Sequence, residues 1–349
     1  MLNKDQNQQV GAGGVAIQAG NNVVVGVSAR EARDIAMDVS KGLLFELSEI
    51  ARGIVSSRVE EITDKVFEKI EREYPAGLQQ AVDPDFQYAL YTVQKQYGRT
   101  GDVELGDLLV DLLVDRSKQD KRDLLQIVLT ESLEVAPKLT GSQISNLSML
   151  FLFRYTMNHQ VECFETFGGY LDKYVQPFVV DLNKGKASFQ HLAFTGCGAD
   201  QLGEMKLENI LQHNYTGLFF KGFNRESLEE QGLPQEVGQN FIIRCLNDNS
   251  AFQINCLNTD ALNAKLEYYS VQESDRQKIN NLFGLAMMSA EEIIKRCTTI
   301  RPYMSEMFSV WNDSDMKSYS LTSVGMSIGH ANIKRCIGEE FANLSIWIC

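Results

Sequence analysis

The sequence predicts a mainly α fold. A helical bundle-like domain with a long N-terminal helix is followed by an α-rich domain with a few short strands. Three observations favour this class. Apolar residues recur every three or four positions over long stretches, which places them on one face of a helix. Proline is scarce, at 6 of 349 residues, so few positions interrupt a helix. The apolar runs that are typical of strands are short and lie in the C-terminal half.

The first helix is expected to begin directly after Ser28. Ser28 and Glu31 have the spacing of a capping box, in which each side chain accepts a hydrogen bond from the backbone of the other residue. The apolar stripe that follows belongs either to one long helix reaching Tyr74 or to two stacked helices broken near Gly53. Pro75 ends this region. The stripe consists of Ile35, Val39, Leu43, Leu47, Ile50, Ile54, Ile62, Val66 and Ile70.

Further amphipathic helices complete the first domain, which is expected over residues 28–181. Asp83 and Pro84 form an N-cap and first-turn pair, and Thr140 and Gln143 form a second capping box. Short loops between such helices favour antiparallel neighbours in a bundle. The helices are expected at 84–97, 104–115, 122–136 and 141–157.

The second domain, expected over residues 182–349, combines helices with minor β-structure. The apolar runs 241–246 and 251–257 flank a polar, hairpin-like turn at 247–249, so they are expected to be strands. The segment 195–198 is expected to be a loop. The remaining elements are helices at 258–268, 275–297 and 302–311, a short strand at 319–321, and a helix from the Thr322–Ser323 cap to Cys336.

The charge balance argues against nucleic acid as a partner. Lys and Arg number 33 against 46 Asp and Glu, a net charge of −13, so there is no basic excess to neutralise phosphates. No apolar run approaches the ~20 residues of a membrane span, and the N-terminus lacks the apolar region of a secretory signal. The seven cysteines are scattered without a CxxC pair, which is typical of buried thiols in a reducing compartment. A cytoplasmic location is therefore expected.

Residues 1–27 differ in composition from the rest of the chain. They are rich in Gln, Asn, Gly and Val and carry almost no charge. In a cross-β stack, Gln and Asn amides form ladders, β-branched side chains interdigitate, and low charge removes repulsion between copies. Self-assembly is expected here. The alternatives are a flexible polar tail and a small β-structure packed on the body or wound with two partner copies. The residues expected to carry assembly are Gln9, Val10, Gly11, Ile17, Gln18, Ala19, Gly20, Asn21 and Asn22.

Two tripeptides recur in this segment, Gln-Val-Gly at 9–11 and Gln-Ala-Gly at 18–20. With Ile17 before the second and Asn21 after it, the segment resembles the RIP homotypic interaction motif and bacterial amyloid signalling motifs. It departs from them at Ala19, where those families have a larger aliphatic residue. The whole chain also resembles an uncharacterised group of bacterial proteins found near anti-phage defence genes. These resemblances imply a signalling or interaction protein of antiviral defence that binds other copies of itself and proteins with a similar motif.

The rival interpretation is an effector enzyme within residues 182–349 whose activity assembly controls. Its weak candidates are Cys197, which lies between two glycines, and His191, six residues earlier. Flanking glycines can expose a thiol, and a nearby base raises its thiolate fraction. No third orienting residue is identifiable, so the sequence favours an inert loop or core thiol, and the chain is not assigned a reaction.

No metal and no cofactor are expected. Asp107, Asp111 and Asp115 share one helix face, as carboxylates of two-metal enzymes do, but the leucines opposite them favour a solvated face. The glycine-rich segment 11–14 neither opens a helix nor precedes a Walker lysine. The histidines are dispersed, without the close spacing of a helical zinc site, and the one at position 330 is expected to be a packed residue; they are His159, His191, His213 and His330.

Overall fold

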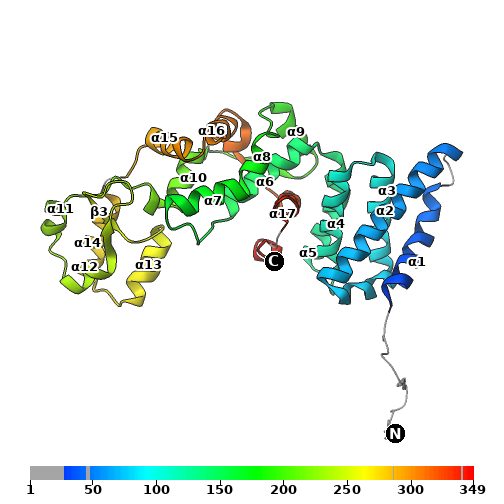
Figure 1. The fold of residues 1–349 in the computed structure, drawn as a ribbon, viewed down its shortest axis with the longest axis horizontal. Helices are drawn as coiled ribbons and strands as arrows, with labels where there is room; N and C mark the ends of the chain where they lie inside the picture. The colour runs from blue at the N-terminus through cyan, green and yellow to red at the C-terminus, as the bar shows by residue number, and fades with distance from the viewer. Residues whose placement is uncertain (1–26, 45–47, 286, 339–340) are drawn as a thin grey trace, which may run out of the picture. The chain divides into compact units, whose positions relative to one another are not determined.

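The computed structural model describes residues 27–44, 48–285, 287–338 and 341–349 (Figure 1). It confirms the mainly α fold class, because 70% of the structure is helical and the strands are few and short. The residues expected to carry self-assembly, all within 9–22, lie outside the described residues.

The chain divides into two compact units. Unit 1 contains the described residues up to Gly106 together with Leu113–Asp120, and unit 2 contains Asp107–Leu112 and Lys121–Cys349. The division therefore passes within one helix, α4 (Val103–Ser117). The boundary expected near residue 182 does not separate the two units, because the helices of 124–181 belong with the C-terminal half.

Unit 1 is a group of adjacent helices whose N-caps follow the sequence signals. Both bonds of the first capping box form: the backbone N–H of Glu31 donates to Ser28 Oγ at 3.3 Å, and that of Ser28 donates to Glu31 Oε2 at 3.0 Å. Asp83 caps its helix as expected. The elements are α1 (Ala29–Ser40), η1 (Lys41–Leu44), α2 (Glu49–Glu73), η2 (Pro75–Val82), α3 (Pro84–Thr100) and part of α4.

The alternative of one long helix is wrong, and so is the break near Gly53. Helix α1 ends at Ser40, and Gly53 lies inside α2. Helix α1 packs mainly through small residues, and the predicted apolar stripe does not continue as one buried face into α2. Ala32, Ala36 and Ser40 are buried, whereas the stripe residues Ile50 and Ile54 at the start of α2 are 81% and 51% exposed.

Polar contacts connect α1, α2 and α3 inside unit 1. The buried Gln94 of α3 donates from Nε2 to Thr63 Oγ1 at 2.9 Å and to the carbonyl of Ala36 at 3.2 Å. Arg33 of α1 forms an ion pair with Asp64 of α2. These bonds link the three helices, which lie side by side (Figure 1).

Unit 2 has α6 (Gly141–Tyr155) and α17 (Ser323–Ile337) at its centre, although their first residues are 182 positions apart in the sequence. Asn332 Nδ2 of α17 donates to Ser148 Oγ of α6 at 2.9 Å, and both side chains are buried. The apolar run 149–153 of α6 is buried as expected. A helix near the C-terminus therefore packs on a helix that was expected to belong to the first domain. The capping box of Thr140 and Gln143 begins α6 as expected.

The other helices of unit 2 surround this pair and extend from it. They are α5 (Leu124–Val135), α7 (Phe164–Tyr174), α8 (Gln176–Val179), α9 (Lys186–Phe194), α10 (Leu207–Asn214), α11 (Arg225–Gln231), α12 (Gln235–Phe241), α13 (Thr259–Tyr268), α14 (Glu273–Gly284), α15 (Ala290–Ile300) and α16 (Met304–Asn312), with short 3-10 turns η3 (Ala136–Lys138), η4 (Thr216–Leu218), η5 (Asp315–Lys317) and η6 (Leu344–Ile346).

Two small antiparallel pairs make up the β-structure of the described residues. The expected hairpin is confirmed, because β2 (Ile242–Arg244) pairs with β3 (Phe252–Ile254). The expected strand at 319–321 is confirmed as β4 (Tyr319–Leu321), and it pairs with β1 (Gly198–Asp200), part of which was expected to be a loop. The helix expected at 275–297 is two helices, because the capping box of Ser289 and Glu292 starts α15 after α14 has ended.

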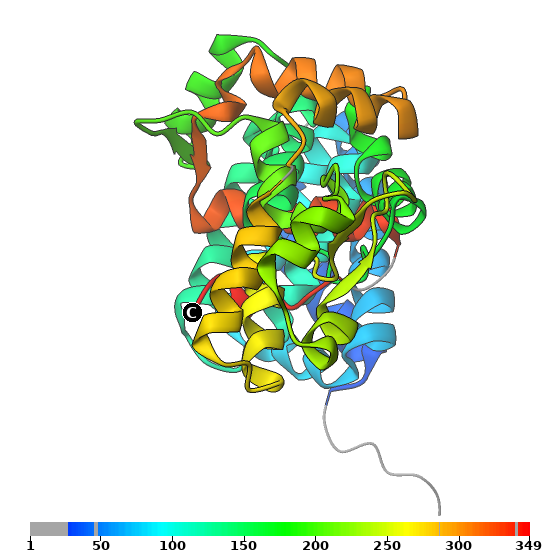
Figure 2. The same ribbon diagram turned by 90° about the vertical axis from the view of Figure 1, so that its left-hand side faces the viewer.

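Helices α11–α14 and strands β2 and β3 form a lobe with an apolar core of its own (Figure 1; Figure 2 shows it in front). We call this part the α11–α14 lobe. Its buried side chains come from the residues before α11, from α12, β3, α13 and α14; they are Phe223, Phe241, Ile254, Leu262, Leu266, Ile279 and Leu282.

No helix in the described ranges is both long enough and apolar enough to cross a membrane.

Candidate functional site

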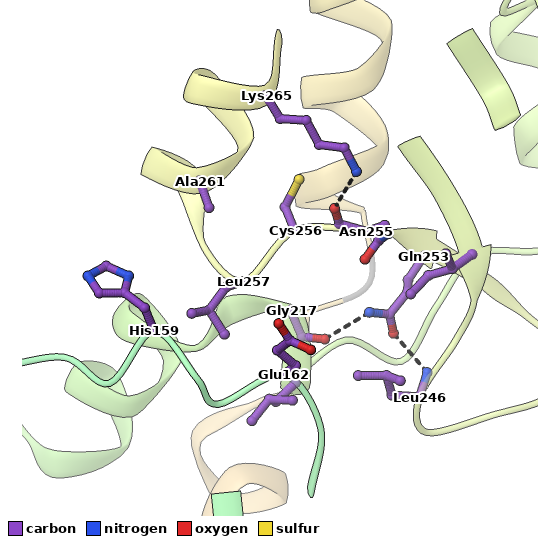
Figure 3. A pocket seen from close by; sticks show the side chains of 12 residues that line it. His159, Glu162, Gly217, Leu246, Gln253, Asn255, Cys256, Leu257, Ala261 and Lys265 are labelled. Atoms are coloured by element: carbon purple, nitrogen blue, oxygen red, sulfur yellow. Dashed lines mark hydrogen bonds between the residues drawn. The ribbon is translucent and has the colours of Figure 1, made fainter. Parts of the chain in front are cut away.

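A polar cavity of about 470 Å³ lies in unit 2, where the α11–α14 lobe meets the connection between α6 and α7 (Figure 3). That connection supplies His159 and Glu162, and the turn η4 supplies Gly217 and Leu218. The lobe supplies the rest of the lining, namely Ile243, Leu246, Gln253, Asn255, Cys256, Leu257, Ala261 and Lys265. The volume falls in the range of small-molecule sites.

The wall of this cavity is held by Gln253, which is buried to 1% exposure. Its Nε2 donates to the carbonyl of Gly217 at 2.9 Å, and its Oε1 accepts from the backbone N–H of Leu246 at 2.9 Å (Figure 3). The N–H of Gly217 donates to the carbonyl of Leu257 at 2.7 Å. A Cβ at position 217 would lie 2.1 Å from the carbonyl oxygen of Cys256, so only glycine permits this close approach.

The cavity presents one cation and one carboxylate. Lys265 Nζ donates to the carbonyl of Asn255 at 3.1 Å and lies 5.2 Å from the centre of the Phe241 ring. Glu162 is exposed, and its backbone N–H donates to Thr166 Oγ1 at 3.0 Å. Within the part of the chain that the structure describes, neither charged side chain forms an ion pair. Both charges therefore remain available to a ligand.

Cys256 contributes a neutral thiol to the lining. Burial raises its pKa to about 11, although the nearby Lys265 acts in the opposite direction. At neutral pH this thiol stays protonated, so it is a poor nucleophile and a weakly polar wall.

A second cavity, of about 570 Å³, adjoins the first at His159, which lines both. Its walls come from α6, α7, the α6–α7 connection and the C-terminal segment. Burial raises the pKa of the Tyr170 hydroxyl well above its ordinary value. The aromatic side chains of this wall are Tyr155, Tyr170, Tyr174, Phe341 and Trp347.

The weak catalytic candidates Cys197 and His191 are not brought together. Cys197 is completely buried, and this burial raises the pKa of its thiol. Its sulfur lies 3.5 Å from Thr195 Oγ1, whereas His191 Nδ1 lies 3.1 Å from Gln143 Nε2. The flanking glycines therefore do not expose the thiol, because β1 and the start of α17 pack around Cys197. The N–H of Thr322, the cap of α17, donates to the carbonyl of Cys197.

The acidic row on α4 is not a uniformly solvated face, which corrects the favoured interpretation. Asp111 is 1% exposed and lies 3.9 Å from Lys334 Nζ, while Asp115 accepts from Lys118 Nζ at 2.9 Å. Val110 and Val114, on other sides of α4, are buried as well, so this helix is not exposed along one whole face. No three potential metal-ligating side chains gather anywhere in the described ranges.

His330 is a packed histidine, as expected. It is 4% exposed, its Nε2 lies 2.7 Å from the carbonyl oxygen of Ala342, and its ring contacts that of Phe151 edge-on.

No pattern in the sequence marks Glu162, Gln253 or Lys265 as site residues, and His159 is one of four dispersed histidines. These residues belong to segments about 100 positions apart, and none lies in a recognisable local motif. The one local pattern that bears on these residues is the predicted hairpin, in which Gln253 of β3 pairs with Ile243 of β2.

A family model matches residues 26–348, and the function of that family is unknown. The chain belongs to this family. No curated protein and no solved structure matches the chain. The family match begins one residue before the described structure, so the matched residues include both units and both cavities but not the residues expected to carry self-assembly.

Proposed function

We propose that this protein is a cytoplasmic signalling or interaction protein that self-assembles through its N-terminal segment. One observation carries the proposal. The family match begins at residue 26 and the first capped helix at Ala29, directly after the almost uncharged Gln/Asn/Gly segment. The segment thus precedes the residues that the family model matches.

The chemistry of the segment supports homotypic contacts. The backbone groups of stacked copies pair along the stack, and the amides of Gln18, Asn21 and Asn22 add ladders between identical residues. Ile17 supplies a β-branched side chain for the seam between sheets. Because the segment resembles the RIP homotypic interaction motif and bacterial amyloid signalling motifs, we also propose proteins with a similar motif as its partners.

The start of the body suits this role. The N–H of Val27 donates to Gln79 Oε1 at 3.1 Å, and Ser28 caps α1. Assembly of the segment would therefore gather helical bodies at a fixed point of unit 1, and raise their local concentration. By the resemblance of the whole chain, the setting that we propose is bacterial antiviral defence.

Replacement of Ile17-Gln18-Ala19-Gly20 by four alanines tests the proposal. We expect the variant to lose the large assemblies and to keep the melting temperature of the original chain, because the segment stabilises contacts between copies. The matched control is a chain in which residues 1–26 are scrambled at constant composition; it should also fail to assemble. A clear fall in the melting temperature of the four-alanine variant would instead mean that the segment packs on the body.

A further inference from the structure

We propose that the polar cavity binds a free α-amino acid with an apolar side chain. The proposal rests on unit 2 alone and goes beyond self-assembly. It starts from the two opposite charges in the lining, those of Lys265 and Glu162. In Figure 3 the Lys265 side chain reaches the Asn255 carbonyl, and Glu162 lies beyond Asn255 in that view.

A ligand with one positive and one negative group would match the charges of Lys265 and Glu162. A carboxylate would pair with Lys265, whose Nζ donates only to a backbone carbonyl and faces the Phe241 ring. An ammonium group would pair with Glu162. A ligand with only one charge would leave the other side chain unmatched, and a nucleotide would bring several negative charges to one lysine and one glutamate. A zwitterion matches the lining in sign and in number.

The uncharged part of the lining fixes the rest of the ligand. The amide of Asn255 and the ring of His159 also line the cavity and can form hydrogen bonds. Burial keeps the Cys256 thiol neutral, so it adds no third charge. Four aliphatic side chains complete the wall and favour an apolar ligand side chain; they are Leu218, Ile243, Leu246 and Leu257.

The wall is prepared before a ligand arrives. Both ends of the Gln253 amide are occupied by Gly217 and Leu246, so this buried side chain does not compete for the ligand. A wall fixed in this way loses little conformational freedom when a ligand binds.

Equilibrium dialysis of the full chain with labelled L-leucine, L-methionine and L-phenylalanine tests the proposal. We expect at least one of these to bind and to raise the melting temperature. Two analogues of leucine separate the charges: leucinamide lacks the carboxylate and 4-methylpentanoate lacks the amine. Both should bind at least about tenfold more weakly, because each loses a charge-assisted hydrogen bond.

Lys265→Gln and Glu162→Gln should each weaken leucine binding about tenfold or more. The matched controls are Lys295→Gln and Glu165→Gln, which change exposed residues outside the cavity and should leave binding unchanged. The proposal is overturned if none of the three amino acids binds at about 10 mM, if both cavity variants bind as the original chain does, or if the analogues bind as well as leucine.

Discussion

The guanidinium of Arg301 donates two hydrogen bonds to the carboxylate of Asp172, from Nε to Oδ1 and from Nη2 to Oδ2, each 2.6 Å long. The hydroxyl of Tyr303 donates to the same Oδ1 at 3.0 Å. Asp172 lies on α7, and Arg301 lies between α15 and α16. This bidentate pair therefore joins two parts of unit 2 that are about 130 residues apart in sequence.

The pair makes stability depend on pH. The hydrogen bonds from Arg301 hold the pKa of Asp172 below its ordinary value. A lowered pKa in the folded state gives stability that is present above the unfolded value, near 3.9, and lost as pH falls through the folded value. We expect Asp172→Asn to cost up to about 1 kcal/mol at neutral pH, because the pair is partly exposed. Urea unfolding at pH 7 and pH 3 measures this cost, which should be smaller at pH 3; an equal cost at both would contradict the explanation.

The buried contact between Asp111 and Lys334 predicts a larger effect. Asp111→Ala should destabilise the protein by about 3 kcal/mol or more, because it removes one partner of a buried ion pair. Asp115→Asn is the control on the same helix; it changes a less buried pair and should cost below about 1 kcal/mol. Equilibrium denaturation checks both. A stabilisation by Mg²⁺ that Asp111→Ala abolishes would instead restore the metal interpretation of this row.

The close approach of α17 to Cys197 makes Gly325 sensitive to substitution. A Cβ at Gly325 would lie 1.9 Å from the carbonyl oxygen of Cys197, so Gly325→Ala should cost about 1–3 kcal/mol through overpacking. Gly169→Ala is the matched control within α7. A Cβ there has no other atom within 4 Å, and the change should stabilise by up to about 1 kcal/mol. Thermal unfolding measures both variants. A lower melting temperature for Gly325→Ala and an equal or higher one for Gly169→Ala would support this packing, whereas equal shifts would contradict it.

Thiol reactivity should follow the environments of the cysteines. Hydrogen bonds with Thr166 lower the pKa of Cys163, whereas burial raises that of Cys256 to about 11 and that of Cys297 to about 12. At pH 8, iodoacetamide should therefore modify Cys163 before Cys197, Cys256 and Cys297. Mass spectrometry of timed samples gives the order. Rapid modification of Cys197 in the native protein would reopen the nucleophile hypothesis.

Features that depend on a few neighbouring residues could be predicted from the sequence. The caps at Ser28, Asp83 and Thr140 form as expected, and so does the hairpin of β2 and β3. The Ser289–Glu292 capping box also has a local signature, and it would have divided the helix expected at 275–297.

Features that depend on distant contacts could not be predicted in this way. The expected boundary near residue 182 ignored the packing of α17 on α6, and the acidic row on α4 looked solvated because the burial of Asp111 depends on residues far away in sequence. The polar cavity is a stronger case. Glu162 and Lys265 line the same cavity only through the fold, and neither carries a local signature of binding.

Self-assembly through the N-terminal segment is tested most directly by light scattering after size exclusion, with electron micrographs, on the full chain and on a chain that lacks residues 1–26. We predict large or fibrous species for the full chain and one small, discrete species for the shortened chain, because the family-matched body begins where the assembly segment ends. The same small oligomer from both chains would contradict self-assembly and would leave the cavities of unit 2 as the place to look for function.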